Sequence, residues 1–187
     1  MLEPEAGRPS ISVRPLGEEH ANAFARFAKD VPDGERRFVK ESLETSDAGF
    51  EAMLAQPGVR RLVAEVSGGG IVGLAGVFLG RGWSSHVGEL RVLVSADHRR
   101  EGVGRVLAHA ALIRALEDGC SHAYIEVVAE QEGLVAMFQD LGFEPEALLS
   151  DFVRDGNGNF HDLMLLTHRV DDQYGRQAVL GLDEVVA

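Results

Sequence analysis

The segment Arg99-Arg-Glu-Gly-Val-Gly-Arg105 follows an apolar run that ends near Val94 and opens the apolar-periodic run Val103–Glu117. It therefore lies where a predicted strand gives way to a predicted helix. The first N–H groups of a helix have no partner within it, and the helix dipole adds partial positive charge there. Two glycines let the backbone approach an anion closely, and the flanking arginines add charge. The pattern predicts a pyrophosphate site, with a purely structural turn as the alternative.

The spacing of the glycines excludes two common nucleotide-binding motifs. The dinucleotide fingerprint Gly-x-Gly-x-x-Gly fails because position 107 is leucine, and the chain has no Gly-Lys-Ser/Thr of a P-loop. What remains is Val-x-x-x-x-Arg-x-x-Gly-x-Gly, from Val94 to Gly104, in a strand–turn–helix context.

Apolar periodicity around this segment predicts an alternation of strands and helices. Strands are expected over 11–16, 60–65, 71–79, 86–94, 123–128, 148–154 and 160–167, and helices over 18–31, 33–43, 47–56, 103–117 and 132–141. The order predicts an α/β (α+β) fold with a mixed, mostly antiparallel sheet of about seven strands flanked by helices. The strand–helix–strand unit over 86–128 must be parallel and right-handed.

The composition is that of one globular domain. The chain has 187 residues, 45% of them hydrophobic and 26% charged, and Cys120 is its single cysteine. A core of ordinary size is expected without disulfides. We expect a flexible start over 1–10, the main domain over 11–170 and a C-terminal extension over 171–187.

Charge and hydropathy exclude several classes of function. The formal net charge of −12 argues against nucleic-acid binding, which requires basic surface. No apolar run approaches the roughly 18 residues that span a membrane, and the first residues do not read as a secretory signal, so a cytoplasmic location is expected. The histidines and the cysteine form no ligand motif, so no metal is expected.

Two motifs together resemble the GCN5-related N-acetyltransferase (GNAT) superfamily. Arg99, Gly102 and Gly104 match its Arg/Gln-x-x-Gly-x-Gly/Ala pyrophosphate motif. The later segment Met-Phe-Gln-Asp-Leu-Gly-Phe143 is similar to its Leu-Tyr-x-x-Leu-Gly-Phe ending. The order of elements agrees from about residue 11 to residue 169. The resemblance implies an enzyme, an acyltransferase that uses acetyl-CoA as co-substrate and acetylates a primary amine.

The resemblance also implies where the cofactor lies. In the family the sheet is splayed between the fourth and fifth strands, and the acyl-pantetheine arm lies in that opening like an extra strand. Backbone groups of the fourth strand would pair with the arm, namely those of Val92, Leu93 and Val94. The pyrophosphate would be held by the following turn, namely Arg99, Arg100, Glu101, Gly102, Val103, Gly104 and Arg105.

Two carboxylates are candidates for the catalytic base. An alkyl ammonium group, with a pKa of about 10, must lose a proton before it can attack a thioester. Glu89 lies inside the apolar run Val87–Val94, and Glu126 lies on the fifth strand. Family members place a base at either position, so we predict both as catalytic residues, with solvated strand carboxylates as the alternative. Burial in the apolar run is expected to raise the pKa of Glu89.

The sequence does not assign a general acid. Many family members have a tyrosine where this chain has Phe138, and phenylalanine has no proton to give. The helical spacing of Phe138 predicts a packing residue. Tyr124, Ser95 and water remain open as donors to the departing thiolate.

The acceptor and the assembly stay open as well. Val13-Arg-Pro-Leu16 and Glu35-Arg-Arg-Phe38 are similar to the opening of bacterial protein-lysine acetyltransferases, so the acceptor is either a small-molecule amine or a protein lysine. Phe138 leaves open an acyl-CoA-binding regulatory module with little or no turnover. A plain interaction domain with a structural glycine turn is a third reading, and a homodimer is open.

Overall fold

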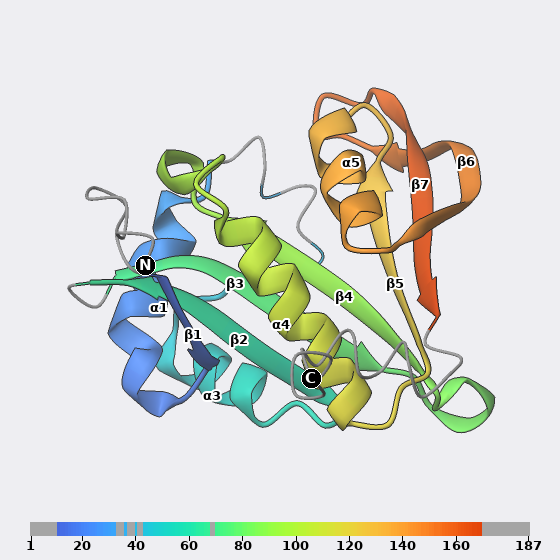
Figure 1. Cartoon of the computed structure of the whole chain (residues 1–187). Coiled ribbons are helices and arrows are strands. Elements are labelled where there is room, and N and C mark those ends of the chain that lie inside the picture. Colours follow the sequence, from blue (N-terminus) through green and yellow to red (C-terminus); the bar gives the residue numbers. More distant parts are fainter. Residues whose placement is uncertain (1–10, 33–35, 37–39, 41–42, 68–69, 170–187) are drawn as a thin grey trace, which may run out of the picture.

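A computed structural model describes residues 11–32, 36, 40, 43–67 and 70–169. Figure 1 shows a twisted sheet with helices on both of its faces. The strands are β1 (Ile11–Pro15), β2 (Val59–Val66), β3 (Gly70–Leu79), β4 (Val87–Val94), β5 (His122–Val128), β6 (Glu144–Arg154) and β7 (Phe160–Arg169). The α-helices are α1 (Ala21–Asp30), α3 (Asp47–Leu54), α4 (Val103–Glu117) and α5 (Glu132–Asp140), and short 3-10 turns cover Glu18–His20, Gly82–Ser84 and Ala96–His98.

The seven strands form one sheet in the order β1-β2-β3-β4-β5-β7-β6. Every neighbouring pair is antiparallel except β4 and β5, which are parallel. This confirms the mixed, mostly antiparallel sheet predicted from the sequence. The right-handed crossover expected for a strand–helix–strand unit runs through α4.

The parallel pair is short. β4 and β5 are in register at Val87–His122, Gly88–Ala123 and Glu89–Tyr124 only, although each strand continues for several residues beyond. Beyond this point β4 stays paired with β3 as far as Val94, and β5 stays paired with β7 as far as Val128. We call the point after Glu89–Tyr124 the β4–β5 fork. It is the splay predicted between the fourth and fifth strands, and the two strands diverge from it in Figure 1.

Two apolar cores lie on opposite faces of the sheet. The core on the α4 side contains side chains of every second residue of β4 and β5: Leu90, Val92, Val94, Ala123, Ile125 and Val127. The core on the α1 and α3 side includes Phe24, Phe50, Leu74 and, at its edge, Leu93. Successive residues of a strand face opposite sides of the sheet. The β4 and β5 residues that alternate with those of the α4-side core therefore face the α1 side. Glu89, Arg91, Tyr124 and Glu126 therefore share one face.

The structure differs from the sequence prediction at the edge strand β6. The strand begins at Glu144, not at Leu148, because the backbone of Glu144 and Pro145 already pairs with β7. Glu144-Pro-Glu146 has no apolar alternation, and a proline is tolerated in a strand that has a neighbour on one side only. The first helix begins as a 3-10 turn at Glu18. The predicted helix over 33–43 lies almost entirely outside the described residues, as do the terminal segments 1–10 and 171–187.

Candidate active site

The glycine turn, residues 99–105, connects the 3-10 turn after β4 to α4. Gly102 caps the helix with φ +88°, a left-handed conformation that glycine adopts without strain, and a Cβ there would meet nothing within 4 Å. The N–H of Val106 bonds to the carbonyl of Gly102 at 3.1 Å, which is the first bond of the helix. The N–H groups of residues 103–105 precede it, as an anion-binding helix start requires.

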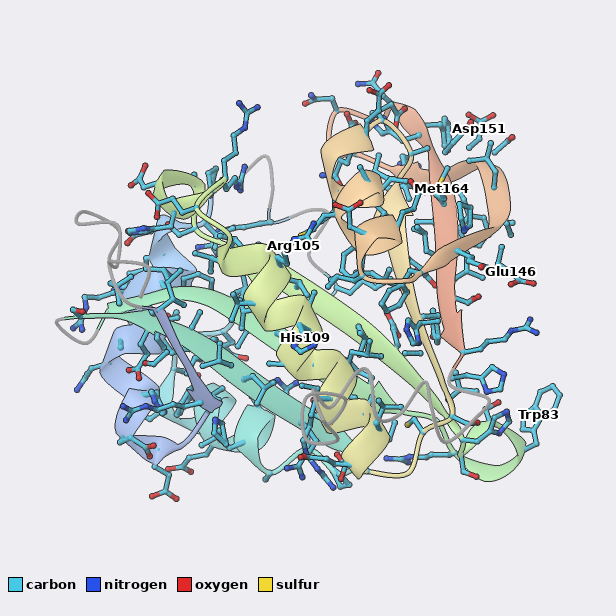
Figure 2. All side chains as sticks on the ribbon, viewed as in Figure 1. Trp83, Arg105, His109, Glu146, Asp151 and Met164 are labelled. Atoms are coloured by element: carbon cyan, nitrogen blue, oxygen red, sulfur yellow. The ribbon has the colours of Figure 1, made fainter. Side chains whose placement is uncertain are left out.

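Three arginines belong to this turn, at positions 99, 100 and 105. The Arg99 guanidinium donates to the carbonyl oxygen of Val94 at 3.4 Å, which ties the turn to the end of β4. Arg100 is exposed and has φ +62°, and Arg105 lies 2.6 Å from Asp140 Oδ2 on α5. Figure 2 shows Arg105 at the N-terminal end of α4. Three guanidinium groups thus lie on seven consecutive residues around one helix start.

Three further residues of the glycine turn were predicted to bind the cofactor: Glu101, Val103 and Gly104. Glu101 is exposed and its Oε2 lies 2.9 Å from His98 Nδ1, whereas the Val103 side chain is buried, so Val103 can offer a ligand only its backbone. Gly104 packs between β4 and α5, where a Cβ would lie 3.5 Å from Val94 Cγ2 and from Met137 Sδ. The glycine turn, the end of β4 and the start of α4 are therefore brought together as predicted.

Val92, Leu93 and Val94 form the β4 side of the fork. They pair with Ala75, Leu74 and Gly73 of β3. Within the described residues, their register has no counterpart on β5. A strand has hydrogen-bonding groups on both edges, so this edge can accept an extended ligand.

At the fork itself lies a cluster of polar side chains, which we call the Glu89 cluster: Lys40, Glu89, Arg91, Tyr124 and Glu126. The Arg91 guanidinium donates two hydrogen bonds to the Glu89 carboxylate, from Nε to Oε1 at 2.8 Å and from Nη2 to Oε2 at 3.0 Å. The same guanidinium stacks 3.7 Å from the centre of the Phe78 ring. Arg91 thereby fixes the orientation of the Glu89 carboxylate.

The direction of the Glu89 pKa shift differs from the sequence prediction. Glu89 is buried, with 8% of its surface exposed, and burial by itself raises its pKa. The guanidinium of Arg91 and the ammonium of Lys40 outweigh burial, so the pKa of Glu89 is lowered below its ordinary value of 4.5. The predicted rise is therefore wrong, because it considered burial alone and left out Arg91 on the same face of β4 and Lys40, which is 49 residues away in the sequence.

Tyr124 lies opposite Glu89 on β5, and its hydroxyl donates to Glu89 Oε2 at 3.3 Å. Burial and the carboxylates of Glu89 and Glu126 raise the pKa of Tyr124 to about 12. The hydroxyl therefore keeps its proton at neutral pH. Of the two side chains left open as proton donors, Tyr124 belongs to the Glu89 cluster, whereas Ser95 follows the far end of β4.

Lys40 joins the two predicted carboxylates. Its Nζ lies 3.1 Å from Glu89 Oε1 and also contacts Glu126 Oε2. Its carbonyl oxygen accepts from Arg91 Nη1 at 3.3 Å. One ammonium group therefore contacts both carboxylates that the sequence singled out.

Sequence reasoning missed Lys40 and Arg91. Lys40 is 49 residues from Glu89 and 86 from Glu126, so no local pattern links them. Arg91 could have been found, because it lies two residues after Glu89 and must share its face of β4.

Phe138 is fully buried on α5, with its ring centre 5.2 Å from that of Phe143 in an edge-to-face arrangement. This confirms its predicted packing role. Trp83 is 94% exposed and extends away from the fold beside the start of β4, as Figure 2 shows.

Neither a metal site nor a membrane span is found in the part of the chain that the structure describes. Over these residues, no group of three or more His, Cys, Asp or Glu side chains could hold a metal ion. None of the described helices is both long and apolar enough to cross a membrane.

Solved structures share this fold over most of their length. A GNAT-family acetyltransferase from Streptococcus pneumoniae is 18% identical with a TM-score of 0.73, and the match covers 86% of this chain and 100% of that one. A ribosomal-protein-alanine N-acetyltransferase from Brucella melitensis is 23% identical with a TM-score of 0.70, covering 85% and 99%. A spermidine N-acetyltransferase from Vibrio cholerae, solved with CoA and spermine, is 17% identical with a TM-score of 0.71, covering 85% and 95%. At these identities the likeness shows the fold.

Sequence comparison gives the family. No curated protein matches the chain. The model of the acetyltransferase (GNAT) family matches residues 25–143, more than half of the 187 residues, and this range contains the glycine turn and the whole Glu89 cluster. The chain therefore belongs to the acetyltransferase (GNAT) family.

Proposed function

We propose that this protein is an acetyl-CoA-dependent N-acetyltransferase that moves an acetyl group to a primary amine by direct attack, with Glu89 as the base. The main support for the proposal is that β4 connects two sites, the Glu89 cluster and the glycine turn. The glycine turn follows the end of β4, and the Glu89 cluster lies five residues earlier, about 17 Å along an extended strand. The open edge of β4 runs between them.

The glycine turn is suited to the pyrophosphate of CoA. The N–H groups of residues 103–105 and the space above Gly102 admit an anion, and Arg99, Arg100 and Arg105 supply charge. The backbone of Val92, Leu93 and Val94 would pair with the pantetheine arm. When bound, acetyl-CoA supplies a thioester carbonyl that an amine can attack.

The Glu89 cluster is suited to an ammonium group. The lowered pKa of Glu89 keeps its carboxylate ionised at neutral pH, so it can receive a proton. Glu126, with 23% of its side chain exposed, would hold the ammonium from the other strand. A backbone N–H of β4 near Val92–Val94 would stabilise the oxyanion of the tetrahedral intermediate.

The acceptor is a small-molecule amine or a protein lysine. Relatives of the same fold are named for a ribosomal-protein alanine and for spermidine, so the fold alone does not choose between acceptor classes. The acidic chain, with a net charge of −12, favours cationic acceptors by long-range attraction. No general acid is included, because CoA thiol, with a pKa of about 8.5, leaves readily as thiolate.

Calorimetric titration with acetyl-CoA followed by a thiol-release assay tests the proposal. We expect binding, and release of CoA that depends on an added amine from a panel of polyamines and lysine peptides. Binding without release for any amine would contradict catalysis and favour the regulatory module. Absence of binding would contradict both and leave a structural glycine turn.

A further inference from the structure

Lys40 occupies the position that the proposed function gives to an acceptor amine. Its Nζ contacts both carboxylates of the fork, Glu89 at 3.1 Å and Glu126. Its backbone carbonyl is held by Arg91, the same residue that orients Glu89. Lys40 thus contacts the other members of the Glu89 cluster through both its Nζ and its backbone carbonyl.

The choice of a lysine here is unusual for this chain. Only two of its 18 lysine and arginine residues are lysines, Lys29 and Lys40. An arginine would bind two carboxylates at least as well through its five donors, but its guanidinium does not lose a proton in proteins and cannot serve as a nucleophile. A lysine amine can do so once it is deprotonated.

Stability alone does not explain this contact. The Lys40 side chain is 45% exposed, and ion pairs at that exposure contribute little to folding. The partly exposed ammonium of Lys40 can be replaced between the two carboxylates by another amine, or it can react where it is. The same geometry that would hold an external acceptor holds Lys40.

We propose that Lys40 Nζ is a self-acetylation site, modified by the protein's own active site when acetyl-CoA is bound. The inference rests on the proposed function. Glu89 takes one proton from the Lys40 ammonium, and the neutral amine attacks the thioester carbonyl carbon. The N–C bond forms and the C–S bond breaks, CoA leaves as a thiolate, and the second proton lost from the nitrogen converts that thiolate to the thiol, while the proton on Glu89 passes to solvent. The net reaction converts one ammonium and acetyl-CoA into acetyl-lysine, CoA thiol and one proton.

Acetylation changes the Glu89 cluster. Acetyl-Lys40 carries no charge, so it loses both ion pairs and leaves Glu89 and Glu126 available to the ammonium of an external acceptor. Self-acetylation would therefore occur once per chain and would strengthen binding of cationic amines.

The test incubates the full chain with acetyl-CoA and no added amine, and follows intact mass and acetyl-peptide maps over time. We expect one acetyl group per chain on Lys40, with a first-order rate constant independent of protein concentration. Lys29, the other lysine, serves as the internal control and should stay unmodified on the same timescale. Lys40→Arg should abolish the modification, and Lys29→Arg should leave it unchanged.

Glu89→Gln separates enzymatic from chemical acetylation. The variant should slow Lys40 acetylation at least tenfold, while calorimetric CoA affinity like that of the wild type shows that it is folded. Equal labelling of Lys29 and Lys40, or an equal Lys40 rate in urea-unfolded chain, would overturn the inference. Turnover of external amines with unmodified Lys40 would overturn it and leave the proposed function standing. Failure to bind acetyl-CoA would overturn both.

Discussion

Glu89 and Tyr124 are the last residues in register between β4 and β5, and the Tyr124 hydroxyl donates to Glu89 Oε2 at 3.3 Å. The sheet therefore opens at Glu89, where the polar side chains of the Glu89 cluster lie. On the β4 side the next residues lead to the glycine turn, and on the β5 side Glu126 follows two residues later. Glu89, Glu126 and the open edge of β4 thus meet at one point of the fold.

Removing Arg91 should raise the pKa of Glu89. Burial raises this pKa, and Arg91 is the main group that lowers it, so Arg91→Met should shift the acid limb of kcat/KM to higher pH. In the wild type, the lowered pKa stabilises the fold above about pH 4.5, and this contribution is lost as the pH falls through the folded-state pKa. The variant should lose about 1–3 kcal/mol of unfolding free energy at neutral pH.

Urea unfolding at several pH values, together with pH–rate profiles, measures both effects of Arg91→Met. Arg154→Met, which changes an exposed arginine at the end of β6, is the matched control and should change neither. An acid limb that does not move in Arg91→Met would contradict the assigned role of Arg91.

Two glycine-to-alanine changes should have opposite effects on stability. Gly102 has φ +88°, so Gly102→Ala should lower the unfolding free energy by about 1–2 kcal/mol and weaken CoA binding. Gly133 is the second residue of α5, and a Cβ there would meet nothing within 4 Å, so Gly133→Ala should raise the unfolding free energy by about 0.5 kcal/mol and leave CoA binding unchanged. Thermal unfolding and calorimetric titration check both. Unchanged CoA affinity in Gly102→Ala would contradict the pyrophosphate site.

Replacing Phe138 by tyrosine, the residue that many family members have at this position, should not create a general acid. Phe138 is fully buried against Phe143, so the added hydroxyl of Phe138→Tyr would be desolvated within an apolar core. We expect a loss of about 1–3 kcal/mol of unfolding free energy and no gain in kcat. Phe160→Tyr, at a side chain 59% exposed, should be neutral in both measurements. A rise in kcat for Phe138→Tyr would show that this position reaches the reacting atoms.

Tyr124→Phe tests whether the cluster supplies a proton to the leaving group. Because thiolate departs readily from CoA, we expect kcat to fall by less than about 10²-fold, the lower end of general acid catalysis. Steady-state kcat at neutral pH, with CoA affinity as the folding control, measures this. A larger fall with unchanged KM would assign Tyr124 as the general acid.

Local sequence patterns predicted the sheet and the glycine turn, because both depend on neighbouring residues. Strand alternation and the Gly102–Gly104 spacing are visible within a few positions. The composition of the Glu89 cluster was only half predictable. Glu89 and Glu126 stood out as charges in apolar strands, but Lys40 reaches them across 49 and 86 residues, and no periodicity encodes such a contact. The direction of the Glu89 pKa shift was predicted wrongly, because it depends on Arg91, which shares the face of Glu89 on β4, and on Lys40.

The most direct test of acetyl transfer at the Glu89 cluster compares amine-dependent thiol release from acetyl-CoA in Glu89→Gln and in Glu117→Gln, an exposed glutamate at the end of α4. Glu89→Gln should lose about 10²–10⁴-fold in kcat while keeping its affinity for CoA, and Glu117→Gln should match the wild type. Wild-type turnover in Glu89→Gln would contradict the assignment of Glu89 as the base.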